Sequence, residues 1–204
     1  MRTIAHTTTL IAALVCTAGI AGTAVADWTS DPSVNTALAA GGNDQGQNIT
    51  RPMADGSLWM SFFDNSAGSG YKPTMQRFTK CGVPVFPGLG VVMANRTNTA
   101  TFTYDMKVGP DGAAYCVFDN SGIYVQKVNP DGTLGFGPNG LAMPTMTTLL
   151  GARMAVAADG TLVVACGGSG SSGTVFFQRV NANGTLAGAW TVVEASRAQL
   201  VSDV

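Results

Sequence analysis

The sequence predicts an all-β fold made of repeated small sheets, and three observations lead to this prediction. Glutamate, which natural helices use heavily on their exposed faces, occurs once, as Glu194, and only four lysines accompany it. Two short sequence markers recur in the same order three times along the chain. Short runs rich in Val, Leu, Tyr, Phe and Trp lie between turn residues at regular spacing, as expected for strands.

The composition excludes two classes of protein. Only 11% of the 204 residues are charged, against about 25% in a typical soluble domain. With 11 Lys and Arg against 12 Asp and Glu, the chain lacks the basic excess expected of a protein that binds nucleic acid. A hydrophobic content of 46% also excludes an acidic disordered chain.

Residues 1–26 have the layout of a secretory signal peptide. A weakly positive start is followed by the apolar run Leu10–Ile20, which is too short to span a bilayer, and by small residues up to Ala26. We expect cleavage between Ala26 and Asp27; an uncleaved anchor and a lipoprotein with a lipidated Cys16 are the alternatives. No second span of membrane length follows, which predicts a secreted, periplasmic or cell-surface protein without a transmembrane segment.

The repeats are expected over residues 48–204, after a leader at 27–47 that is either a separate segment or a strand of another repeat. The first marker, a Gln followed by a basic residue and a hydrophobe, recurs at spacings of 50 and 52 residues and starts at Gln76, Gln126 and Gln178. The second marker is Asp-Gly before an apolar run, and it starts at Asp55, Asp111 and Asp159. Two markers that keep the same order three times indicate an internal repeat.

Each copy is expected to hold four short strands. Asp-Gly favours a tight turn before the first apolar run, and the Gln marker ends the next strand. Shorter extended pieces such as Leu141–Met143 and Trp190–Val193 follow, and a last strand leads through Val108 or Val156 to the next Asp-Gly. The run Leu162–Cys166 is apolar on both faces, as in a sheet covered by neighbours on both sides.

Repeats of about fifty residues with four strands each indicate a β-propeller. The expected blades cover roughly 48–100, 101–150 and 151–196, and the first copy has Thr79–Gly82 in place of the Asn-x-Asp-Gly turn. A fourth blade is expected to start at 197–204, since Arg197–Asp203 parallels Arg153–Asp159, and we expect the coding sequence to continue past Val204. Propellers close with about 4–8 blades, so three copies predict an incomplete ring.

The segment Gln126–Gly140 resembles the blade repeats of secreted bacterial β-propeller proteins. There a Gln-Arg-hydrophobe strand meets an Asp-Gly turn, and a Trp-Gly or Phe-Gly step leads to Asn-Gly. The resemblance covers roughly Asp44–Val204 and departs in the third copy after Gly184. It implies an architecture and a bacterial source, and it brings no catalytic residue, because such repeats host many roles.

Several chemistries lack their residues in the mature chain. His6, the only histidine, lies in the expected signal peptide, which excludes Ser-His-Asp and Cys-His catalysis and His-ligated zinc. The remaining cysteines, Cys81, Cys116 and Cys166, are too far apart in sequence for a Cys-x-x-Cys pair. Three buried thiols, or one disulfide and a free thiol, are both compatible with an exported protein. No cofactor or metal is expected.

Paired carboxylates could support glycoside hydrolysis, where one acts as acid and the other as base or nucleophile. Asp64 and Asp119 take similar places after the first strand of their copies, and they are the only catalytic candidates. The aspartates that precede glycine are expected to shape turns instead: Asp55, Asp111, Asp131 and Asp159.

Two further patterns have a structural interpretation. Asn129–Gly132 and Asn181–Gly184 place oxygen side chains at alternate positions, as calcium loops do, but both lack a full ligand set and are expected to be turns. Trp59 lies within an apolar run and is expected in the core.

The sequence therefore predicts an exported, non-catalytic β-propeller module with a binding or structural role, whose ligand is a glycan or a protein. The alternative is a carbohydrate-active propeller, such as a glycoside hydrolase or a lyase-like enzyme, that uses its aspartates.

Overall fold

The computed structural model describes residues 45–99, 104–144, 149–168 and 175–194. The expected signal peptide and the expected start of a fourth blade lie outside these residues, as does the leader up to residue 44. The described residues form strands and turns without a helix, which confirms the all-β prediction. It follows that none of the described segments is a helix of the length and hydrophobicity needed to cross a membrane.

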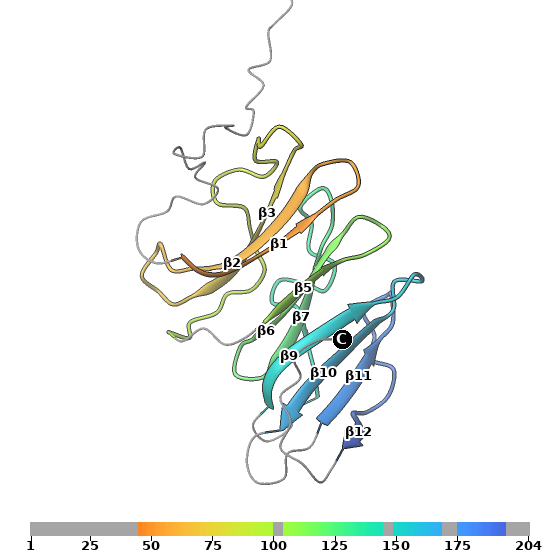
Figure 1. The fold of residues 1–204 in the computed structure, drawn as a ribbon. Coiled ribbons are helices and arrows are strands. Elements are labelled where there is room, and N and C mark those ends of the chain that lie inside the picture. The colour runs from red at the N-terminus through yellow and green to blue at the C-terminus, as the bar shows by residue number, and fades with distance from the viewer. Residues whose placement is uncertain (1–44, 100–103, 145–148, 169–174, 195–204) are drawn as a thin grey trace, which may run out of the picture.

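Twelve strands of the described residues form three four-stranded antiparallel sheets, called blades 1 to 3 below (Figure 1). Blade 1 contains β1 (Gln45–Pro52), β2 (Leu58–Asp64), β3 (Lys72–Phe78) and β4 (Val91–Val92). Blade 2 contains β5 (Asp105–Val108), β6 (Ala114–Asp119), β7 (Ile123–Val128) and β8 (Leu141–Ala142). Blade 3 contains β9 (Leu149–Val156), β10 (Leu162–Gly168), β11 (Val175–Val180) and β12 (Thr191–Glu194).

Each blade is a meander in which sequence neighbours are also hydrogen-bonded neighbours. The first strands of the blades lie next to one another, with β1 against β5 and β5 against β9. Figure 1 shows the three sheets side by side, each turning a face to the next. This is the arrangement of successive propeller blades around an axis lined by first strands, and the three sheets do not close into a ring.

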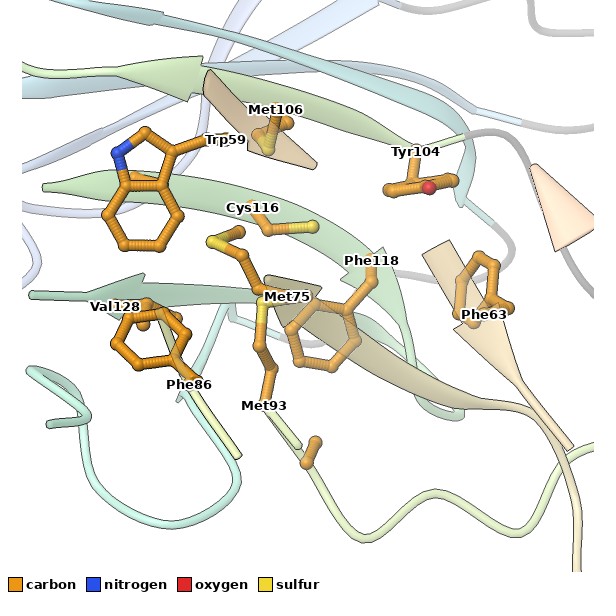
Figure 2. Close-up of a cluster of buried hydrophobic side chains, with 12 residues drawn as sticks. Trp59, Phe63, Met75, Phe86, Met93, Tyr104, Met106, Cys116, Phe118 and Val128 are labelled. Atoms are coloured by element: carbon orange, nitrogen blue, oxygen red, sulfur yellow. The ribbon is translucent and has the colours of Figure 1, made fainter. Parts of the chain in front are cut away.

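Apolar side chains fill both spaces between blades. Between blades 1 and 2, Trp59, Phe63 and Met75 meet Met106 and Phe118, and all five are buried (Figure 2). Between blades 2 and 3, the buried cluster is mostly aliphatic, with side chains such as Val117, Val125, Leu162 and Val164 beside Tyr115. Strands such as β6 are buried on both faces because blade 2 has a neighbour on each side, which explains their continuous apolar runs.

The Asp-Gly marker forms the same turn in all three blades. The backbone N–H of each glycine donates to the carbonyl three residues earlier, at 2.9 to 3.0 Å, with Gly φ between +75° and +81° for Gly56, Gly112 and Gly160. Glycine adopts this left-handed conformation without steric cost, and the aspartate carboxylate accepts the N–H two residues on.

The first copy also forms the second turn, although its sequence lacks the Asn-x-Asp-Gly pattern. The N–H of Thr79 donates to the carbonyl of Val83, and that of Gly82 to Thr79, both at 2.9 Å; Asn129 and Gly132 make the same pair of bonds. The Thr79 hydroxyl accepts the N–H of Val83 at 3.2 Å. The turn forms with a different sequence because its geometry needs only a glycine at positive φ, here Gly82, and a local oxygen acceptor.

The glutamine side chain of the first marker hydrogen-bonds the loop that follows its strand in each blade. Gln76 and Gln126 are buried, and each side-chain oxygen accepts the backbone N–H of the phenylalanine ten residues later, Phe86 or Phe136, at 3.0 and 3.1 Å. The side-chain nitrogen of Gln126 donates to the carbonyl of Gly137, and Gln178 bonds Gly188 in the same way. The glutamine thus satisfies backbone groups of the loop that the following short strand leaves unpaired.

The basic residue of the first marker pairs with the aspartate of the second. Lys127 lies 2.7 Å from the Asp111 carboxylate and Arg77 lies 3.6 Å from that of Asp55, in each case within one blade. Lys127 also lies over the Tyr115 ring, 5.4 Å from its centre. Burial works against the charge of Asp111, but the hydrogen bonds from Lys127 and the Ala113 N–H, together with the charge of Lys127, outweigh burial and lower the pKa of Asp111. In blades 1 and 2, therefore, the two markers meet in an ion pair within the sheet.

The three cysteines are free thiols. Cys116 and Cys166 are buried, and burial raises the pKa of Cys116 well above its usual value and that of Cys166 to about 12. Both therefore pack as small hydrophobic residues. Cys81 lies half-buried in the turn after β3, so the expectation of three buried thiols holds for two of them.

Candidate functional site

Asp64, the first catalytic candidate, lies at the end of β2 and shapes the turn that follows. Its carboxylate accepts the backbone N–H of Ser66 at 3.1 Å and the Ser66 hydroxyl at 2.7 Å. The side-chain amide of Gln45 on β1 donates to it at 3.1 Å. The carboxylate thus holds the β1 end of the sheet and a local turn together.

Asp119, the second candidate, takes the equivalent place at the end of β6 and faces a buried arginine. The Arg96 side chain is fully buried and lies 3.4 Å from the Asp119 carboxylate, which also accepts the amide of Asn98 at 3.1 Å. Arg96 donates to the carbonyls of Asp119 and Tyr71 at 2.6 and 2.9 Å. Desolvation lowers the pKa of Arg96, and the bond to Asp119 opposes this.

The two candidate carboxylates therefore have different partners, and each has a role in the fold. Arg96 lies in the loop after the last strand of blade 1, and Asp119 ends a strand of blade 2, so their ion pair joins the two blades. The structure places Arg96 over the Phe63 ring at 5.1 Å, inside the first inter-blade space. Nothing in the sequence pattern pointed to Arg96, because it lies in a loop outside both markers.

The Asn-x-Asp/Asn-Gly segments are turns that use their own oxygen atoms. The Asp131 carboxylate accepts the N–H and the hydroxyl of Thr133 at 3.0 and 2.7 Å, and Asn183 does the same for Thr185. The residues described in the structure contain no group of three or more His, Cys, Asp or Glu side chains placed to hold a metal ion.

A polar pocket of about 440 Å³ opens where the three first strands meet. Each of these strands contributes one or two charged side chains to the pocket: Arg51 from β1, Asp105 and Lys107 from β5, and Arg153 from β9. The rest of the lining consists of Asn48, Ile49, Thr50 and Tyr104. First strands line the axis of a propeller-type array, so the pocket lies where all three blades contribute side chains.

Asp105 is the centre of the polar network in this pocket. One carboxylate oxygen accepts the N–H of Met106 at 2.8 Å and lies 3.5 Å from Arg51. The other accepts the N–H of Met154 on β9 at 3.1 Å and lies 3.5 Å from Lys107. The carboxylate thus joins blades 2 and 3, while Arg51 joins blade 1 to blade 2 through its bond to the Met106 carbonyl at 3.0 Å.

A β-bulge shapes the blade 1 side of the pocket. The pairing of β1 with β2 shifts between Gly46 and Ile49, and Gln47 has a φ of +52°. The Tyr104 hydroxyl donates to the Gln47 carbonyl at this bulge, and burial raises the Tyr104 pKa. A non-glycine residue at positive φ is unusual, and bulges of this kind are common beside binding sites, where they redirect side chains.

The pocket residues lie outside both sequence markers, although their spacing from one marker is a signal. Arg51 and Lys107 each lie four residues before the aspartate of an Asp-Gly marker, and Asp105 and Arg153 each lie six residues before one. In a chain with 11% charged residues, charges at a fixed distance from a repeat marker indicate equivalent positions on one strand of each blade.

No protein-family model matches the chain, and no curated protein sequence matches it. Among solved structures, the chain is similar to the crystal structure of an exo-β-1,3-galactanase from Clostridium thermocellum, with 12% identity and a TM-score of 0.40. The similarity covers 74% of this chain and 35% of the galactanase chain, so the chain spans about a third of that protein.

Proposed function

We propose that this chain is an exported, non-catalytic binding module that holds its ligand at the pocket between β1, β5 and β9. The observation that supports this most directly is the use made of the two candidate carboxylates. Asp64 and Asp119 are held by hydrogen bonds that form a turn and a blade interface, and neither lines the pocket. The pocket itself offers fixed charged and polar groups from three blades, which suits recognition.

To test for binding without catalysis, the exported full chain is incubated with panels of oligosaccharides and of extracellular proteins. We expect retention of a ligand by the protein and no release of new reducing ends. Asp119→Asn and Asp64→Asn are expected to keep this binding. Hydrolysis by the wild-type chain that either variant abolishes would overturn the proposal in favour of a carbohydrate-active enzyme.

Export is tested on the same material. We expect the protein to leave the cytoplasm and its N-terminus to begin at Asp27, after the signal-type segment 1–26. A cytoplasmic product that retains Met1 would contradict the exported location, while the binding experiment would still stand.

A further inference from the structure

We propose that the pocket between β1, β5 and β9 takes an acidic saccharide and binds it through its carboxylate or sulfate group. This inference rests on the proposed binding function and names the class of ligand. Three positive side chains, Arg51, Lys107 and Arg153, line the pocket together with a single carboxylate, that of Asp105. The pocket therefore has a formal charge of about +2, whereas the whole chain has a net charge of −1.

The carboxylate of the pocket is nearly buried, whereas two of its cations are partly exposed. The Asp105 side chain is 6% exposed and accepts two backbone N–H groups. The side chains of Arg51 and Lys107 are 38% and 25% exposed. A molecule that enters the pocket therefore meets the positive groups, and the buried carboxylate holds them in place. Charge-assisted hydrogen bonds from arginine and lysine favour carboxylate and sulfate oxygens.

The remaining lining favours a sugar over other anions. A volume of about 440 Å³ exceeds the needs of a single small ion and falls in the usual range for small-molecule sites. Exposed Asn48 and Thr50 offer an amide and a hydroxyl to the hydroxyl groups of a sugar. The aromatic ring of the pocket, Tyr104, is only 5% exposed, so it offers no face on which a nucleotide base could stack.

Calorimetry on the full chain tests the charge requirement with matched sugars. Oligogalacturonate, which has a carboxylate on each unit, is compared with neutral galactose oligosaccharides of the same length, and sodium sulfate serves as the ion alone. We expect the acidic sugar to bind at least tenfold more tightly than the neutral sugar. Its affinity should fall several-fold when ionic strength rises from about 0.01 M to about 0.15 M, because screening acts on the exposed cations.

Variants locate the effect in the pocket. Arg153→Gln, in the pocket, is expected to weaken binding of the acidic sugar about tenfold. Arg179→Gln is the matched control, since Arg179 is an exposed cation of the same blade that lies outside the pocket, and it should change binding less than twofold. Lys107→Gln is a second pocket variant, and melting temperatures show which variants stay folded.

The outcomes separate this inference from the proposed function. Equal effects of the Arg153 and Arg179 variants, or equal binding of acidic and neutral sugars, would overturn the acidic-saccharide proposal while leaving a binding module. Sulfate that binds as tightly as the sugar would also overturn it, because the site would then select an ion only. Hydrolysis of the sugar would contradict the non-catalytic function and not the choice of ligand.

Discussion

The two spaces between blades are filled differently, although the same repeat builds both. Between blades 1 and 2, large aromatic side chains such as Trp59 and Phe86 pack together, the buried cation Arg96 lies over the Phe63 ring, and hydrogen bonds cross the space. Between blades 2 and 3, the described side chains are mostly aliphatic, with crossing bonds from Met154 to Asp105 and from Trp190 to the Pro144 carbonyl.

This difference shows that the repeat specifies the sheet, while residues outside the markers specify how sheets meet. The Asp–cation pair acts inside a blade, and so do the bonds of the marker glutamine to the loop that follows its strand. Trp59, Arg96 and Asp119 act between blades and have no equivalent set at the second interface in the described part of the chain. Blades of one pattern are thus joined by one polar and one mainly apolar contact, and the following substitutions test this contrast.

The largest expected loss comes from Trp59→Ala. Trp59 is fully buried, its ring centre lies 5.8 Å from that of Phe86, and its indole N–H donates to the Gly112 carbonyl of blade 2 at 3.2 Å. We expect the free energy of unfolding to fall by about 3–5 kcal/mol in urea denaturation. Val163→Ala is the control, at the same register position of blade 3, with an expected loss of about 1 kcal/mol. Equal losses of unfolding free energy in the two variants would show that Trp59 adds no stability beyond that of its counterpart in blade 3.

Asp119→Asn is expected to have the next largest effect. It leaves the buried Arg96 without a counter-charge, and breaking a buried pair costs about 3–5 kcal/mol; with Asp119 itself 23% exposed, we expect about 2–3 kcal/mol. Asp64→Asn, at the equivalent strand end, disturbs a turn and one bond to β1 within blade 1, and should cost about 1 kcal/mol. Urea denaturation of both variants checks this order, and a larger loss for Asp64→Asn would refute the inter-blade role of Asp119.

The smallest expected loss of stability distinguishes two copies of the marker glutamine, Gln126 and Gln178. Gln126 donates to the Met93 carbonyl across the first interface, in addition to its bonds within blade 2. The side-chain oxygen of Gln178 has no hydrogen-bond partner among the described residues. Gln126→Leu should therefore cost about 2 kcal/mol and Gln178→Leu about 1 kcal/mol, compared by thermal unfolding. Identical melting temperatures for the two variants would contradict a contribution of Gln126 to the contact between blades 1 and 2.

The sheet pattern was predictable from sequence because it depends on local chemistry. Asp-Gly turns, the Gln marker and apolar runs such as Leu162–Cys166 each fix neighbouring backbone, so strands and their order follow from spacing. The pocket between β1, β5 and β9 was not predictable in the same way. It forms from Arg51, Lys107 and Arg153, which are about fifty residues apart and meet only when the blades pack. The role of Arg96 likewise depends on which loop the second blade covers.

The meander within each blade has a consequence for how the chain folds. Every hydrogen-bonded strand pair in the described residues joins segments that follow one another in sequence, and the tight Asp-Gly turns hold the first two strands together. Closing such short loops has a small entropic cost. Each sheet can form before its neighbours arrive, so the docking of finished sheets, with the burial of Arg96 as its most demanding step, is expected to limit the rate of folding.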